Sequence, residues 1–484
     1  MTTAIAFDNT YAHLPPRFFA RVDPTRVKAP RVVHVNTALA ETLGIDPALL
    51  LGPDGAALLS GNQVPVGAEP IAQAYAGHQF GGFSPQLGDG RAILLGEVVG
   101  RDGMRRDIQL KGSGPTPWSR RGDGRAALGP VLREYLISEA MAALGVPTTR
   151  ALAAVTTGEH VFRDSALPGG VFARVAASHI RVGTFQYFAA RSDVDGVRTL
   201  ADYVIARHYP EASAAPNPYR AMLDGVVARQ ADLIPQWLAI GFIHGVMNTD
   251  NMAVSGETID YGPCAFMDAY DPAAVFSSID EGARYAYANQ PQIAHWNLTR
   301  LAEALLPLLG ETREAGVEAA KEALGAFGPR FEAAYMRRMR KKIGLGPDGD
   351  ADLAQDLLSR MAQNQADFTL TFRRLCGAAA GPDGDAPIRA LFLDGAAYDE
   401  WAVQWRTRLA PGAAASMRAL NPAVVPRNHL VEEAIAAAVT HDDFAPFEAL
   451  LDATSRPFED RPDGDRFTQP PAVADPSYRT FCGT

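Results

Sequence analysis

The side chains best suited to chemistry lie in the run 244–262, which reads HGVMNTDNMAVSGETIDYG. Asn251 and Asp260 carry hard oxygen atoms, the ligands that Mg²⁺ prefers beside nucleotide phosphates and water. Asp250 is the carboxylate of the run best placed to accept a proton from a reacting hydroxyl. A loop and hairpin with incidental carboxylates is the plainer interpretation. The pattern nevertheless favours metal-assisted chemistry on phosphates.

A second group of residues upstream is suited to holding phosphates. Gly88 and Gly90 form a turn in which backbone N–H groups can approach phosphate oxygens, and Arg91 follows with its charge. Lys111 ends the apolar alternation of "IQLK", where a lysine can emerge into a cleft. A glutamate on the next helix would hold it, and both Glu134 and Glu139 qualify.

Further arginines and glycines belong to the same candidate site. Asp123 and Gly124 lie in "SRRGDGRAALG", a run dense in charge and glycine, as in loops that face nucleotides. Arg174 and Arg181 follow in "FARVAASHIRVG", where either a helix or a strand would fit. Arginine recognises phosphate through its planar fork of donors.

The order of these pieces is that of a protein kinase: a glycine-rich turn, a strand lysine, a helix glutamate, a catalytic loop and a metal-binding loop. His244-Gly245 and Asn251 reproduce the spacing of the kinase catalytic loop. Val246 stands where kinases have the catalytic Asp, and valine cannot accept a proton. Asp250 is therefore the candidate base.

The elements that must position these residues divide into a strand-rich and a helical part. Strands are expected over 91–100 and 105–114, and a buried helix over 131–144, with Pro130 at its start. Long helical stretches follow over 220–240, 312–342 and 352–376, and a Gly/Ala/Asp linker over 377–387.

We therefore expect an α+β fold, bilobal and similar to protein kinases. The strand-rich N-lobe would cover 1–180, the helical C-lobe 181–376, and a C-terminal helical extension with a tail 377–484. The active site would lie in the cleft between the lobes.

Composition narrows the function classes. The 484 residues are 47% hydrophobic and 21% charged, as in globular proteins, and the net charge of −10 argues against nucleic-acid partners. No apolar run is long enough to span a membrane, and no signal peptide is apparent, so we expect a cytoplasmic protein. Cysteines 264, 376 and 482 are too scattered for a zinc site.

The blocks "YAGHQFGGFSPQLGDGRAILLGE", "LKGSGPTPWSRRGDGRAALGPVLREYLISEAMAALGVPTTRAL" and "HGVMNTDNM…IDYGPCAFMD" resemble the signature blocks of the selenoprotein O family. The resemblance runs from about residue 10 to the C-terminus. That family is similar to kinases but binds ATP reversed, so the resemblance implies AMPylation of Ser, Thr or Tyr on target proteins, redox proteins among them.

The resemblance also implies roles for individual residues. It places the nucleotide on Gly88, Gly90, Arg91, Lys111, Asp123, Gly124, Glu134, Arg174, Arg181 and Asp260, the metal on Asn251 and Asp260, and the base at Asp250. It leaves Mg²⁺ or Mn²⁺, and ATP or UTP, open.

Two other functions remain open at this point. The alternatives to AMP transfer are a conventional kinase, which Val246 disfavours, and a scaffold that binds ATP without chemistry, which the retained Asp250, Asn251 and Asp260 disfavour. We also hypothesise that Cys264 and Cys482 form a disulfide that tethers the tail.

Overall fold

The fold is described from a computed structural model of the chain. It covers residues 5–347, 352–462, 464–472 and 478–481. Cys482 lies outside these residues, so the proposed disulfide with Cys264 is not addressed by the structure. Within them, Cys264 and Cys376 are free, buried thiols.

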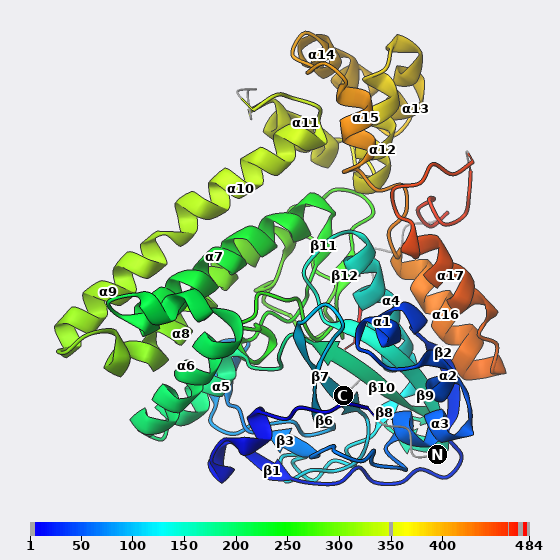
Figure 1. Cartoon of the computed structure of the whole chain (residues 1–484). Coiled ribbons are helices and arrows are strands. Elements are labelled where there is room, and N and C mark those ends of the chain that lie inside the picture. The colour runs from blue at the N-terminus through cyan, green and yellow to red at the C-terminus, as the bar shows by residue number, and fades with distance from the viewer. Residues whose placement is uncertain (1–4, 348–351, 463, 473–477, 482–484) are drawn as a thin grey trace.

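The N-terminal part is built on an antiparallel sheet of eight strands (Figure 1). The strand order is β1-β3-β6-β7-β10-β9-β2, with β8 paired to β10. The strands are β1 (Phe19–Arg21), β2 (Arg31–Val35), β3 (Ile71–Gln73), β6 (Ala92–Val99), β7 (Arg105–Lys111), β8 (Ala126–Ala127), β9 (Arg150–Phe162) and β10 (Ala166–Ala176). Two further strand pairs are β4 (Gly77–Gln79) with β5 (Gly82–Ser84), and β11 (Phe242–Ile243) with β12 (Ala265–Phe266).

The two faces of the sheet have different neighbours. Ile108 and Leu110 of β7 belong to a core shared with three short helices, α1 (Thr37–Thr42), α2 (Pro47–Leu51) and α3 (Pro53–Ser60). The alternate residues of β7, Gln109 and Lys111, point to the opposite face, because successive strand side chains alternate. The apolar alternation of this strand therefore directs its lysine away from that core.

Helix α4 (Leu128–Ala143) covers the other face of the sheet and is the buried helix expected from the sequence. It begins two residues before Pro130 rather than at it. A proline fits there because the first four N–H groups of a helix have no partner within the helix.

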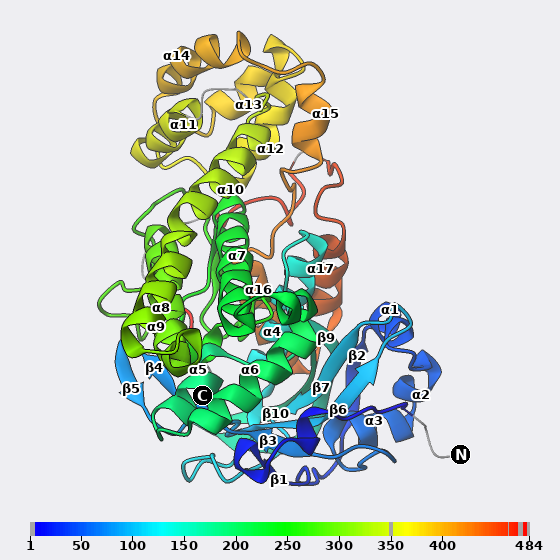
Figure 2. The same ribbon diagram turned by 60° about the vertical axis from the view of Figure 1, so that its left-hand side comes forward.

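The remainder of the chain is mostly helical. Between the sheet and the far helices lie α5 (Val182–Ala189), α6 (Val194–His208), α7 (Pro218–Ala239), α8 (Gln290–Leu309), α9 (Arg313–Gly325) and α10 (Phe327–Lys342). Helix α10 leads away from the sheet to a group at the top of Figures 1 and 2: α11 (Asp352–Gln363), α12 (Phe368–Ala378), α13 (Asp385–Arg389), α14 (Gly395–Arg406) and α15 (Ala413–Arg418).

Three expected segments are divided differently. The stretch 312–342 is two helices, α9 and α10, which meet at Ala326 beside a Gly-Pro pair at 328–329. The stretch 352–376 is α11 and α12, because Asp367 caps a new helix by accepting from the N–H of Leu370. The expected linker 377–387 contains a helical turn and the start of α13.

The last two helices return to the sheet. Helices α16 (Asn428–His441) and α17 (Ala445–Ser455) pack against α4 (Figure 1). The chain after residue 377 therefore lies in two separate places. Helices α13–α15 group with α11 and α12, whereas α16 and α17 pack on α4. None of the helices described by the structure is long and apolar enough to cross a membrane.

Candidate active site

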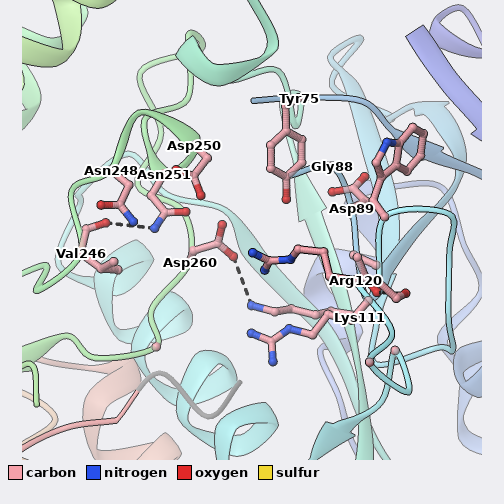
Figure 3. A pocket seen from close by; sticks show the side chains of 18 of the residues that line it. Tyr75, Gly88, Asp89, Lys111, Arg120, Val246, Asn248, Asp250, Asn251 and Asp260 are labelled. Atoms are coloured by element: carbon pink, nitrogen blue, oxygen red, sulfur yellow. Dashed lines mark hydrogen bonds and ion pairs between the residues drawn. The ribbon is translucent and has the colours of Figure 1, made fainter. Parts of the chain in front are cut away.

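A cavity of about 650 Å³ lies between the sheet and the 246–262 segment. Sequence reasoning selected twelve site residues from separate parts of the chain, and all twelve line this one cavity. They are Gly88, Gly90, Arg91, Lys111, Asp123, Gly124, Glu134, Arg174, Arg181, Asp250, Asn251 and Asp260. Figure 3 shows several of them facing one another across the space.

Three cations converge on the carboxylate of Asp260. Its Oδ1 lies 3.1 Å from Nζ of Lys111 and 2.6 Å from Nη1 of Arg174, and its Oδ2 lies 2.9 Å from Nη1 of Arg181. Burial opposes ionisation of Asp260, but Arg174, Lys111 and Arg181 outweigh it and hold the pKa well below the usual range. The carboxylate is therefore charged at neutral pH.

The backbone at Asp260 is unusual as well. Its φ is +65°, in the left-handed region that residues other than glycine seldom occupy. The side chain of the neighbouring Tyr261 is fixed by a hydrogen bond between its hydroxyl and that of Thr148. The loop thus directs the Asp260 side chain toward the three cations, although the backbone conformation at Asp260 is energetically unfavourable.

Of the two glutamates that the sequence offered as partners of Lys111, Glu134 and Glu139, the structure pairs Lys111 with Glu134. Its Nζ donates to Oε1 of Glu134 on α4. Glu139 lies one turn further on and accepts instead from Arg150, at 2.9 and 2.7 Å, and from the N–H of Ala151 at 2.8 Å. Glu139 therefore serves the packing of α4 on the sheet.

Asp250 is buried at the wall of the cavity under the β4–β5 hairpin. Its Oδ2 accepts from the amide of Gln79 at 3.1 Å, whereas its Oδ1 has no hydrogen-bond partner. Gly77 packs so closely that a Cβ there would lie 2.6 Å from Oδ1. Burial raises the pKa of Asp250 to about 6, against the opposing charge of Arg181. A carboxyl with this pKa can accept a proton near neutral pH.

Asn251 and Asp260 are the candidate metal ligands. The amide nitrogen of Asn251 donates to the carbonyl of Val246 at 2.9 Å, which leaves its Oδ1 for a cation. No group of three or more His, Cys, Asp or Glu side chains suited to a metal occurs among the described residues. Two protein oxygens fit Mg²⁺, which usually takes one or two protein ligands and completes its shell with phosphates and water.

The glycine-rich turn is shaped by packing. Gly88 has φ +71°, and a Cβ there would lie 2.3 Å from the indole of Trp118. Between the glycines, Asp89 accepts from the N–H of Gln73 at 3.0 Å and from the amide of Gln109 at 3.2 Å. Gln109 also accepts from Arg174 at 2.6 Å, so the turn is linked to the cations at Asp260.

Arg174 and Arg181 lie on different elements. Arg174 is on β10, on the same sheet face as Gln109, its register partner on β7. Arg181 precedes α5 and lies over the ring of Tyr75, 4.7 Å from its centroid. Of the two interpretations of the run 172–183, the strand is correct for Arg174. Arg181 lies beyond the strand, at the start of a helix.

Sequence reasoning missed three residues of the site: Tyr75, Gln79 and Asn248. Each lines the cavity, and Asn248 accepts from the N–H of Phe80 at 3.1 Å. All three stand inside the blocks that carried the family resemblance, but a neutral polar side chain gives no spacing signal. Their contacts are long-range: Gln79 meets Asp250, Asn248 meets Phe80, and Tyr75 meets Arg181.

These groups form the kind of cleft in which an enzyme handles nucleotide phosphates, set in an α+β fold. Comparison with known proteins supports this class. The family described as "Protein adenylyltransferase SelO" matches residues 2–455. The chain is also 65% identical to "Protein nucleotidyltransferase YdiU" of Methylorubrum extorquens (strain PA1), over the full length of both proteins.

Other relatives give the same result. The proteins with that name from Bradyrhizobium diazoefficiens and Rhodopseudomonas palustris (strain BisB5) are 64% and 62% identical, again over the whole of each chain. The chain therefore belongs to the SelO family of protein adenylyltransferases.

Proposed function

We propose that this protein transfers AMP from ATP to Ser, Thr or Tyr hydroxyls of other proteins and releases pyrophosphate. The observation that carries the proposal is the cluster of Lys111, Arg174 and Arg181 around Asp260. Arg174 and Arg181 are only 2% and 3% exposed. Buried cations suit the outer phosphates of a triphosphate and not an apolar purine ring.

This charge distribution supports a nucleotide with its outer phosphates at the buried end. The α-phosphate would then lie toward Asp250 and Asn251, on the side where an acceptor can enter. Oxygen of the acceptor hydroxyl forms a bond to the α-phosphorus, and the bond from that phosphorus to the bridging oxygen breaks. The hydroxyl proton passes to the carboxylate of Asp250, and pyrophosphate leaves against Lys111, Arg174 and Arg181.

Asn251 and Asp260 would hold Mg²⁺ or Mn²⁺. When bound, the cation supplies charge neutralisation on the phosphate oxygens. Other side chains of the protein hold the phosphate-binding residues in place. Glu134 directs Lys111, and Gln109 connects Arg174 to the glycine-rich turn.

We extend the proposal to the domain architecture, the nucleotide and the acceptor proteins. We propose a kinase-like bilobal fold with an N-lobe at 1–180, a C-lobe at 181–376 and an extension at 377–484. ATP is the proposed nucleotide, with UTP as the alternative. The proposed acceptors are cytoplasmic proteins, redox proteins among them, and nucleic acids and membranes are not proposed as partners.

Labelled nucleotides test the proposal directly. With divalent metal and cell lysate, ATP labelled at the α-phosphate should mark protein, and ATP labelled at the γ-phosphate should not. Intact-mass analysis should show a gain of about 329 Da, one AMP group. Incorporation of γ-label would instead establish the kinase alternative, which the lack of a carboxylate at Val246 disfavours. ATP binding with neither label transferred would indicate a scaffold.

A further inference from the structure

The cavity has an apolar rim on two sides, and the two sides differ in what they contact. Phe80 and Ile279 are exposed and line the cavity, and the N–H of Phe80 donates to Asn248 in the 248–251 loop. Phe162 lines the same cavity but ends strand β9, in the sheet. Phe80 is therefore tied to the loop of the candidate base, whereas Phe162 belongs to the sheet.

Phe162 is unusually open for an aromatic side chain. It is 76% exposed, although its neighbour Val161 is buried in the sheet. Exposed phenylalanines are ordinary when they are isolated, but this one stands at the mouth of a cavity lined with cations. Its ring is available to a flat, apolar partner that enters the cavity.

The hairpin that carries Phe162 is anchored to the glycine-rich loop 122–124. The two guanidinium nitrogens of Arg163 lie 2.9 and 3.2 Å from the carboxylate oxygens of Asp123. Arg163 also donates to the carbonyl of Arg125 at 2.9 Å. Phe162 is thus held beside Asp123 and Gly124, two residues of the candidate nucleotide site.

The direction of the nucleotide decides what this ring contacts. If the outer phosphates occupy the buried cations, the base must lie toward the mouth of the cavity. The mouth near Asp250 is needed by the acceptor hydroxyl. The remaining place for the base is the side of the rim formed by Phe162 and the 122–124 loop.

We propose that Phe162 is the platform on which the adenine of ATP stacks, and that it is a determinant of the preference for a purine nucleotide. This inference rests on the proposed function for the direction of the nucleotide. A bicyclic purine covers more of the ring than a uracil does. Base stacking on an aromatic side chain typically strengthens binding about tenfold or more.

The test compares a ligand that has a base with one that has none. ATP, UTP and inorganic tripolyphosphate, each with Mg²⁺, are titrated calorimetrically into the full chain, Phe162→Ala and Phe162→Trp. We expect Phe162→Ala to weaken ATP binding about tenfold, to change tripolyphosphate binding by less than about twofold, and to bring the ATP and UTP affinities together. Phe162→Trp should restore ATP binding.

A matched control is Leu393→Ala, which truncates an equally exposed apolar side chain, also 76%, outside the cavity. It should leave all three affinities unchanged. An unchanged ATP affinity in Phe162→Ala, or an equal loss for ATP and tripolyphosphate, would overturn the inference. Either result is independent of the labelling experiment, because base stacking is measured by binding and AMP transfer by the label.

Discussion

A single nitrogen of Arg181 joins the candidate base loop to the candidate metal loop. Nη1 of Arg181 lies 2.9 Å from Oδ2 of Asp260 and 2.7 Å from the backbone oxygen of Asp250. The side chain is almost fully buried, so both contacts are made away from bulk water. One guanidinium group, which can also contact a phosphate, thus helps to set the spacing of the two loops.

Asp260→Ala should lower the stability of the folded protein. Loss of the carboxylate leaves Lys111, Arg174 and Arg181 close together without their shared counter-charge, which we expect to lower the free energy of unfolding by about 3 kcal/mol. Added pyrophosphate should recover part of this loss by replacing the missing anion. Thermal unfolding with and without pyrophosphate checks both points. The exposed Asp202→Ala is the control, and an Asp260→Ala variant as stable as this control would contradict the prediction.

Glu134 and Glu139 should behave differently although they share α4. Glu134→Gln weakens the hold on Lys111, so we expect a loss of AMP transfer and of ATP affinity of about tenfold or more. Glu139→Gln weakens contacts to Arg150 and Ala151 and should lower the melting temperature while activity is kept at temperatures where the variant is folded. Parallel assays of the two variants give the comparison. Equal losses of ATP affinity would show that the Lys111 pair has no special role.

Asp250→Asn should separate binding from chemistry. The amide keeps the size of the side chain but cannot accept the acceptor's proton, so transfer should fall by about 10²- to 10⁴-fold. ATP affinity should stay nearly constant because a general base acts chiefly in the transition state. Single-turnover rates and calorimetric ATP binding are the measurements. Near-normal transfer by this variant would exclude Asp250 as the base.

Gln79→Leu should lower the rate without affecting nucleotide binding. Its amide holds Oδ2 of Asp250 at 3.1 Å, and without this bond the carboxylate is free to turn from the acceptor. We expect kcat to fall about tenfold and the KM for ATP to change little. Gln404→Leu, an exposed position on α14, is the control. A change confined to the KM for ATP would argue against a positioning role.

Lys342 should make stability depend on pH. It is buried, with Nζ 2.9 Å from Oδ1 of Asn421, and burial lowers its pKa to about 7. The unfolded lysine titrates near 10.4, so between about pH 7 and pH 10 the unfolded state binds more protons and stability rises with pH.

Replacement of this lysine should flatten that dependence. In Lys342→Met, the slope of unfolding free energy against pH should be smaller by about 1 kcal/mol per pH unit across the window. Urea unfolding at several pH values measures the slope. Lys341→Met, at the exposed neighbouring position, should keep the slope of the original protein. Identical slopes for the two variants would mean that Lys342 titrates normally.

The sequence by itself determined the family, and it selected twelve residues that the fold brings to one cavity. The His-Gly…Asp-Asn…Asp-Tyr-Gly run, the strand lysine and the glycine turn are local signals, since each needs a side chain of a given type at a given spacing. The apolar alternation of "IQLK" also indicated a lysine that emerges into a cleft, and Lys111 at the end of β7 lines the cavity.

Only the tertiary structure decided which residues act together. Glu134 and Glu139 lie on the same helix and look alike in sequence, but the direction of each toward Lys111 or Arg150 depends on how α4 packs on the sheet. Likewise, Gln79 meets Asp250 across 171 positions of chain, and no local pattern encodes such a contact. The convergence of three cations on Asp260 arises because β7, β10 and the start of α5 are brought to one point by the folding of the sheet against the helices.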